Sequence, residues 1–157
     1  MLESAAPVDR RQQITALWTA FLLGLLFHTQ LGLMPLFHGI DVAHAHLHDT
    51  GSVKMSLILW LMLGFFLLPL IAIIGTVFWG SIQYRRAHFT VTVAYSVMNF
   101  LHVIADLQVR PIEWYQILLM VFLFVIGLLL NKVAFEWMRE GDRRHPARSE
   151  YSTAMKR

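Results

Sequence analysis

One stretch of the chain concentrates imidazole side chains, which bind transition metals. The segment HGIDVAHAHLHD, residues 38–49, holds four histidines within eleven residues, and His28 lies ten residues before it. Imidazole suits zinc, copper, nickel and iron, and a short histidine-rich tract is typical of metal binding. We therefore expect a transition-metal site, for copper or zinc, that uses this histidine loop.

The local structure of the loop decides which of its side chains converge. If the loop is helical, four side chains share one face, with two histidines at i and i+4. Those four are His38, Asp41, His44 and His48. If the loop is extended, His44, His46 and His48 line one side instead. The sequence also fits a solvated segment without metal, or a pH sensor.

A second stretch, residues 88–110, combines an apolar composition with polar residues three or four positions apart. This spacing places the polar residues on one stripe of a helix, which we call the polar stripe. The polar stripe comprises His88, Thr92, Tyr95, Asn99, His102, Asp106 and Arg110. Because the other positions are apolar, we expect the stripe to face other protein rather than lipid.

His28 and His102 fall at comparable depths in two predicted membrane spans, so they are candidate partners. Asp106 lies one turn beyond His102 and could fix its tautomer, as carboxylates do for metal-bound histidines. Arg110 could in turn pair with Asp106. We therefore add His28, His102 and Asp106 to the predicted metal ligands. Alternatively, His28 and His102 could ligate one haem b, or the polar groups could simply hold helices together.

The absence of cysteine restricts the ligands that the chain can offer. Thiolate catalysis, disulfides and cysteine-based metal sites are excluded, which leaves imidazole, carboxylate and thioether as donors. Met34, Met55 and Met98 lie in or near the same half of the predicted spans as His28. Thioethers beside imidazoles would favour Cu(I), although methionine is also a common gap filler in protein cores.

The elements that carry these residues are membrane spans. The chain has 157 residues, of which 57% are hydrophobic and 15% are charged, a balance unlike that of a soluble domain. A span needs about 20 apolar helical residues. Four segments qualify: 14–37, 55–80, 89–109 and 114–138. The sequence predicts an all-α integral membrane protein, a four-helix bundle with a single domain over residues 1–138.

The distribution of basic residues predicts the orientation of these spans. Lysine and arginine gather before the first span, between the second and third, and after the fourth. The positive-inside rule then places both termini in the cytoplasm and the histidine loop outside it. Residues 139–157 form a basic tail, which we expect to be cytoplasmic and disordered. The membrane is expected to be a bacterial plasma membrane or an internal membrane.

Several function classes are disfavoured. The basic residues lie at membrane edges without clustered aromatics, so we expect no nucleic-acid binding. Neither a glycine-rich phosphate loop nor a nucleophile elbow is present, so we expect a binding protein rather than an enzyme. A di-iron desaturase would need more histidine boxes than the single pair His44 and His48. The remaining alternatives are an accessory subunit of a membrane complex, a haem protein and a proton pathway. Expected partners are the lipid bilayer and either another membrane protein or a second copy.

Overall fold

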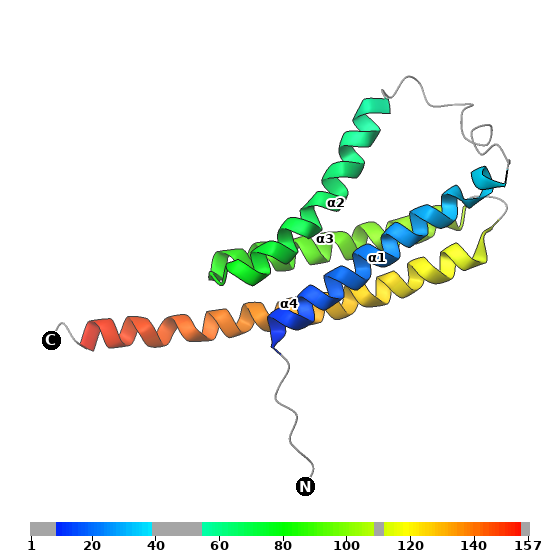
Figure 1. Ribbon diagram of the computed structural model, residues 1–157. Helices are drawn as coiled ribbons and strands as arrows, with labels where there is room; N and C mark the ends of the chain where they lie inside the picture. The colour runs from blue at the N-terminus through cyan, green and yellow to red at the C-terminus, as the bar shows by residue number, and fades with distance from the viewer. Residues whose placement is uncertain (1–8, 39–54, 109–111, 155–157) are drawn as a thin grey trace, which may run out of the picture.

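The protein is all-helical, with four helices that are each long and apolar enough to cross a membrane. The computed structural model describes residues 9–38, 55–108 and 112–154. Figure 1 shows the helices, whose bounds are α1 Arg10–Phe37, α2 Met55–Phe78, α3 Ile82–Asp106 and α4 Trp114–Ala154. The predicted all-α class with four spans is confirmed to that extent.

Two helices begin at polar caps that lie outside the apolar stretches. The carboxylate of Asp9 accepts a hydrogen bond from the backbone N–H of Arg11 at the start of α1. The Ser81 hydroxyl does the same for Tyr84 at the start of α3. Such caps satisfy backbone donors that the first turn of a helix leaves without partners. Because of Ser81, α3 begins at Ile82 rather than at residue 89.

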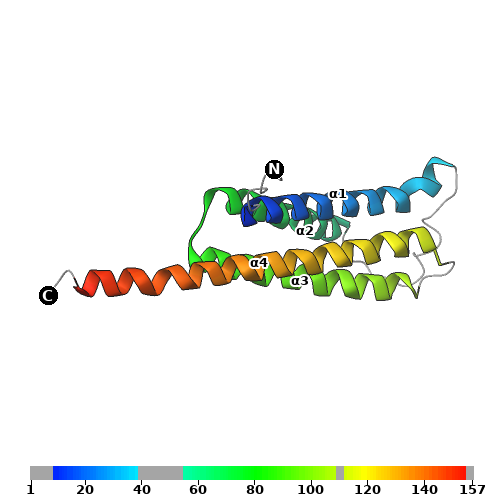
Figure 2. The same cartoon turned by 90° about the horizontal axis from the view of Figure 1, so that it is seen from below.

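The tail predicted to begin at residue 139 starts inside α4. The structure continues α4 as a helix to Ala154, well past the predicted end of the fourth span. This part of α4 projects beyond the other helices (Figure 1 and Figure 2). Extending an existing helix needs no new nucleation, and the arginine, glutamate and alanine of this segment are good helix formers.

The core lies where α1 and α3 pack along α4. On α1, Ile14, Trp18, Phe21 and Leu25 recur every three or four residues and are buried. Two glycines allow close approach, as is common between membrane helices. A β-carbon at Gly24 of α1 would clash with Leu123 of α4, and one at Gly127 would lie 2.9 Å from the Ser96 hydroxyl of α3.

Charged and aromatic residues join the four helices at one end of the molecule. Arg10 pairs with Glu136 at 2.7 Å, and Arg11 donates to the Val77 carbonyl at 3.1 Å. Arg85 donates to the Trp137 carbonyl at 2.8 Å and lies over the Trp137 ring. We call the end that contains Arg10, Arg11 and Arg85 the basic end. Since the starts of α1 and α3 meet the later parts of α2 and α4 there, consecutive helices run in opposite directions.

Helix α2 is attached mainly through its second half. Figure 1 shows its first half diverging from the other helices. Pro69 lies inside α2 and has no N–H, so the carbonyl of Phe65 loses its usual helical donor. The hydroxyl of Tyr95 on α3 donates to that carbonyl at 2.6 Å, and the rings of Phe65 and Tyr95 stack. Tyr95 therefore satisfies the acceptor that Pro69 leaves open.

The polar stripe of α3 makes the same kind of bond to the other two helices. His88, Thr92, Tyr95 and Asn99 are buried, which agrees with the inward orientation expected from their spacing. His88 Nε2 accepts from the indole N–H of Trp18 on α1 at 2.9 Å. Asn99 Nδ2 donates to the Met120 carbonyl of α4 at 3.2 Å. The stripe thus connects α3 with each of its neighbours.

The Tyr95 bond predicts a specific coupling with Pro69. Tyr95→Phe should lower the free energy of unfolding in detergent by about 0.6–2 kcal/mol, the range for hydrogen bonds between membrane helices. In a Pro69→Ala background, position 69 regains an N–H for the Phe65 carbonyl, so Tyr95→Phe should cost less than half as much. Equal costs in the two backgrounds, measured by reversible denaturation, would contradict this account.

Candidate metal centre

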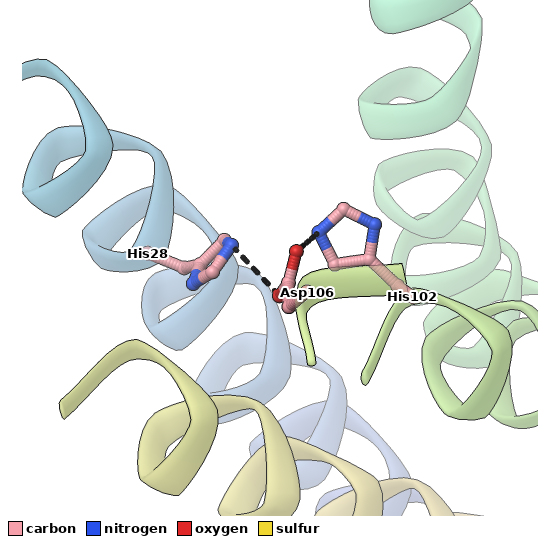
Figure 3. Close-up of side chains that lie close together, drawn as sticks. All are labelled: His28, His102 and Asp106. Atoms are coloured by element: carbon pink, nitrogen blue, oxygen red, sulfur yellow. Dashed lines mark ion pairs between the residues drawn. The ribbon is translucent and has the colours of Figure 1, made fainter. Parts of the chain in front are cut away.

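Three potential metal ligands come together at the end of the molecule opposite the basic end. They are His28 of α1 and His102 and Asp106 of α3, and their ligand atoms all lie within 4.8 Å of one another. The Asp106 carboxylate lies between the two imidazoles (Figure 3). Its Oδ2 is 3.8 Å from His28 Nε2, and its Oδ1 is 3.6 Å from His102 Nε2. We call these residues the histidine–aspartate triad.

Helix geometry explains why these side chains meet. His102 and Asp106 are separated by four residues, so they lie one above the other on α3. His28 reaches them from α1, and its ring centroid is 5.5 Å from that of His102. The side chains of His28 and Asp106 are 11% and 22% exposed, whereas that of His102 is 52% exposed. The triad is therefore enclosed on the α1 side and open at His102.

The three residues of the triad form no hydrogen bonds with one another. Both nitrogen–oxygen distances exceed the range of 2.7–3.2 Å that is usual for such bonds. His28 Nδ1 and Asp106 Oδ2 are buried without any hydrogen-bond partner. Buried polar atoms are nearly always paired, so unpaired ones need an explanation such as an ion.

The donor set fits a small transition-metal ion. Bonds of about 2.0–2.2 Å from zinc to imidazole nitrogen and carboxylate oxygen put tetrahedral ligand atoms roughly 3.3 Å apart. The triad atoms would have to approach one another by up to about 1.5 Å, which side-chain rotations can supply. Two histidines and one carboxylate leave further positions of the ion open, as in catalytic zinc and non-haem iron sites.

A cavity of about 430 Å³ lies beside the triad and is lined by residues of all four helices. His28 and His102 line it together with Asn99, and the rest of its wall is almost entirely apolar. Asn99 is 5% exposed, and its Oδ1 is buried without a partner. Asn99 thus lines the same cavity as the two imidazoles and carries a buried acceptor without a hydrogen-bond partner.

The two triad histidines are also those of the predicted bis-histidine haem. In such a haem the iron lies between the two imidazoles. In this structure the carboxylate of Asp106 lies there instead (Figure 3). His88, the remaining histidine of the polar stripe, binds the Trp18 indole through Nε2 and packs against Trp137 in the core. Its role within the described residues is packing rather than ligation.

The one other predicted ligand that the structure describes, His38, does not join the triad. His38 caps the end of α1 and is exposed, about 15 Å along the helix from His28 at 1.5 Å per residue. Met34 is also exposed. Five predicted site residues lie outside the part of the chain that the structure describes: Asp41, His44, His46, His48 and Arg110.

Two sulfur-bearing residues of the cavity were not identified from the sequence. Met62 of α2 and Met120 of α4 line the cavity together with Met98 of α3. Met62 and Met120 each lie within about 11 Å of the end of their own helix that is nearer the triad, at 1.5 Å per residue. Their depth in the membrane, similar to that of the triad, could therefore have been predicted from the sequence. Helices α2 and α4 carry no polar stripe in these spans, and depth alone did not show which of their faces points inward.

Comparison with known protein families, with curated proteins and with solved structures finds no match to this chain. The site is therefore interpreted from its own chemistry.

The register of α1 against α3 can be tested by cross-linking, since the chain contains no cysteine. A variant with His28→Cys and His102→Cys should be joined by a short bis-maleimide, because the two native rings are in contact. The matched control pairs His28→Cys with His88→Cys, because position 88 lies about 21 Å from position 102 along α3. Protease digestion at an introduced site between α1 and α3 reports the link on a gel. Equal cross-linking of both pairs would refute this register.

Proposed function

We propose that this multi-pass membrane protein binds a transition-metal ion, copper or zinc, through His28, His102 and Asp106. The single observation that carries the proposal is the contrast between this triad and the rest of the polar stripe. Residues that only hold helices together should form closed hydrogen bonds. His88, Tyr95 and Asn99 each make at least one hydrogen bond to another helix, although His88 Nδ1 and Asn99 Oδ1 are also buried without partners. The triad instead brings three metal-ligating groups together with no hydrogen bond between them.

The contrast is measurable within one helix. From α3, His88, Tyr95 and Asn99 bond to three other helices at 2.9, 2.6 and 3.2 Å. One to two turns further along, both distances from Asp106 to the imidazoles are 3.6 Å or more. An ion at the centre of the triad would satisfy Asp106 and both rings at once. Without one, an acidic group within an apolar span costs up to about 3 kcal/mol.

Charge complementarity supports the same proposal. A metal-bound carboxyl group is deprotonated, so it contributes a negative charge that balances part of the charge of the cation. The apolar cavity beside the triad lowers the local dielectric constant and strengthens this attraction. Asn99 lines the same cavity, and its buried, unpaired Oδ1 would be an acceptor for the free ring N–H of a bound imidazole.

We further propose that the histidine loop supplies ions to the triad from outside the cytoplasm. The loop follows α1 directly, and α1 carries His28. The proposed orientation puts the basic end in the cytoplasm, in keeping with the positive-inside rule, so the triad lies near the opposite face of the membrane. The protein would then capture metal outside and hold it within the bundle, for storage, transfer or redox use.

Metal content tests the triad directly. With His44, His46 and His48 all changed to alanine, the purified protein should still bind one zinc or copper ion per chain. Adding Asp106→Asn or His28→Leu should weaken binding at least about tenfold, because each removes a ligand. Elemental analysis and competition with a chromophoric chelator measure both quantities.

The matched control is His88→Gln, which removes the imidazole of the same helix that the structure places in packing contacts. It should lower thermal stability and leave the metal count unchanged. Metal binding that survives every triad substitution, or that disappears equally in His88→Gln, would rule out the triad as the site.

Orientation can be tested with single cysteines in the cysteine-free chain. Ser52→Cys in the loop should react with a membrane-impermeant maleimide on intact cells, whereas Ser152→Cys in the tail should react only after the cells are lysed. The physical basis is the excess of lysine and arginine at the basic end. The reverse labelling pattern would place the histidine loop in the cytoplasm.

A further inference from the structure

We infer that the ion at this site is copper(I) and that thioether sulfur from one or more of Met62, Met98 and Met120 completes its coordination. The inference rests on the proposed metal site and names the metal that the site selects. The three methionines come from α2, α3 and α4, and they line the same cavity as His28 and His102. Residues with two chemical kinds of donor therefore line one cavity, and they come from all four helices.

The position of Met98 connects the sulfur donors with the triad. Met98 and His102 are separated by four residues on α3, so their side chains are neighbours on one face. Met62 reaches the cavity from α2 and Met120 from α4. A methionine side chain has three flexible bonds before its methyl group, so its sulfur can move toward an ion without backbone movement.

The three methionines differ in their exposure. Met62 and Met98 are 47% and 46% exposed, and they border a cavity that their own side chains leave open. Met120 is the buried member, at 1% exposed. Leu63 and Leu101 of the same helices are similarly exposed, at 51% and 58%, so the feature that distinguishes the methionines is the cavity that they line together. Three flexible thioethers around an open cavity are suited to a ligand.

Donor chemistry selects copper(I) among the metals that imidazole accepts. Soft thioether ligands favour Cu(I), whereas carboxylate and water favour harder ions. The chain has no cysteine, so methionine is its only soft sulfur donor. One or more sulfurs added to the two imidazoles would give the low-coordinate, soft environment in which Cu(I) is preferred.

Net charge favours the same ion. The triad contains one acidic group and two neutral rings, so Cu(I) with a deprotonated Asp106 forms a neutral unit. A divalent ion would leave an uncompensated positive charge beside an apolar cavity within the membrane, where such a charge is costly. Copper(I) is therefore the transition ion whose charge this site balances.

The test compares copper(I) with zinc in matched variants. The protein with its loop histidines changed to alanine is loaded anaerobically with Cu(I), kept reduced by ascorbate, or with Zn(II). X-ray absorption on the copper form should show sulfur as well as nitrogen and oxygen neighbours. In Met62→Leu, Met98→Leu, Met120→Leu protein, the sulfur signal should vanish and Cu(I) affinity should fall about tenfold or more, which corresponds to 1.4 kcal/mol. Zn(II) affinity should stay within about twofold.

Leucine conserves the volume of methionine, so this variant should fold, and Met34→Leu is the matched control outside the cavity. A copper spectrum without sulfur, or Cu(I) affinity unchanged in the triple variant, would overturn the methionine assignment while leaving the triad intact. In that case, Asp106→Asn or His28→Leu should still abolish binding of both metals, whereas the triple methionine variant should not. Absence of any binding in the parent protein would overturn the site itself and the copper assignment with it.

Discussion

The hydrogen bond from Tyr95 to the Phe65 carbonyl governs how α2 joins the rest of the molecule. Inside a bilayer no water is available to satisfy a free carbonyl, so the acceptor that Pro69 leaves open must find a donor in the protein. Tyr95 provides it at 2.6 Å and stacks on the Phe65 ring. The half of α2 that follows this hydrogen bond lies along the other helices, and the half that precedes it diverges from them (Figure 1).

The cavity beside the triad depends on where α2 lies. Leu61, Met62, Phe65 and Phe66 belong to the diverging half of α2 or its boundary, and they form one wall of the cavity. The facing wall carries His28 and His102. At the basic end, ion pairs and the Trp18–His88 bond leave the helices closely joined. The bundle is thus tight at one end and open at the other, where the ligand groups lie.

Much of this arrangement follows from spacing and depth in the sequence. Hydropathy gives the spans, and the three- and four-residue steps from His88 to Asn99 give the inward face of α3. Counting residues from the ends of the predicted spans places His28 and His102 at similar depths in the membrane. The ends of α3 and α4 differ from prediction, because caps and helix propagation extend helices past their apolar stretches. The positions of Met62 and Met120 required the helix packing, since an entirely apolar helix does not mark its inner face.

Binding of an ion at the triad would also change the mechanics of the bundle. Helices α1 and α3 each pack along α4. At the triad, α1 and α3 approach each other through the side chains of His28, His102 and Asp106. An ion bound to His28 and to His102 and Asp106 would cross-link α1 with α3 at the open end. Such a ligand stabilises the folded state by about 2.7 kcal/mol when its concentration is 100 times its dissociation constant. Residues of α2 line the same cavity as His28 and His102. If the ion binds more tightly in one position of α2, then occupancy of the triad must favour that position by the same free energy.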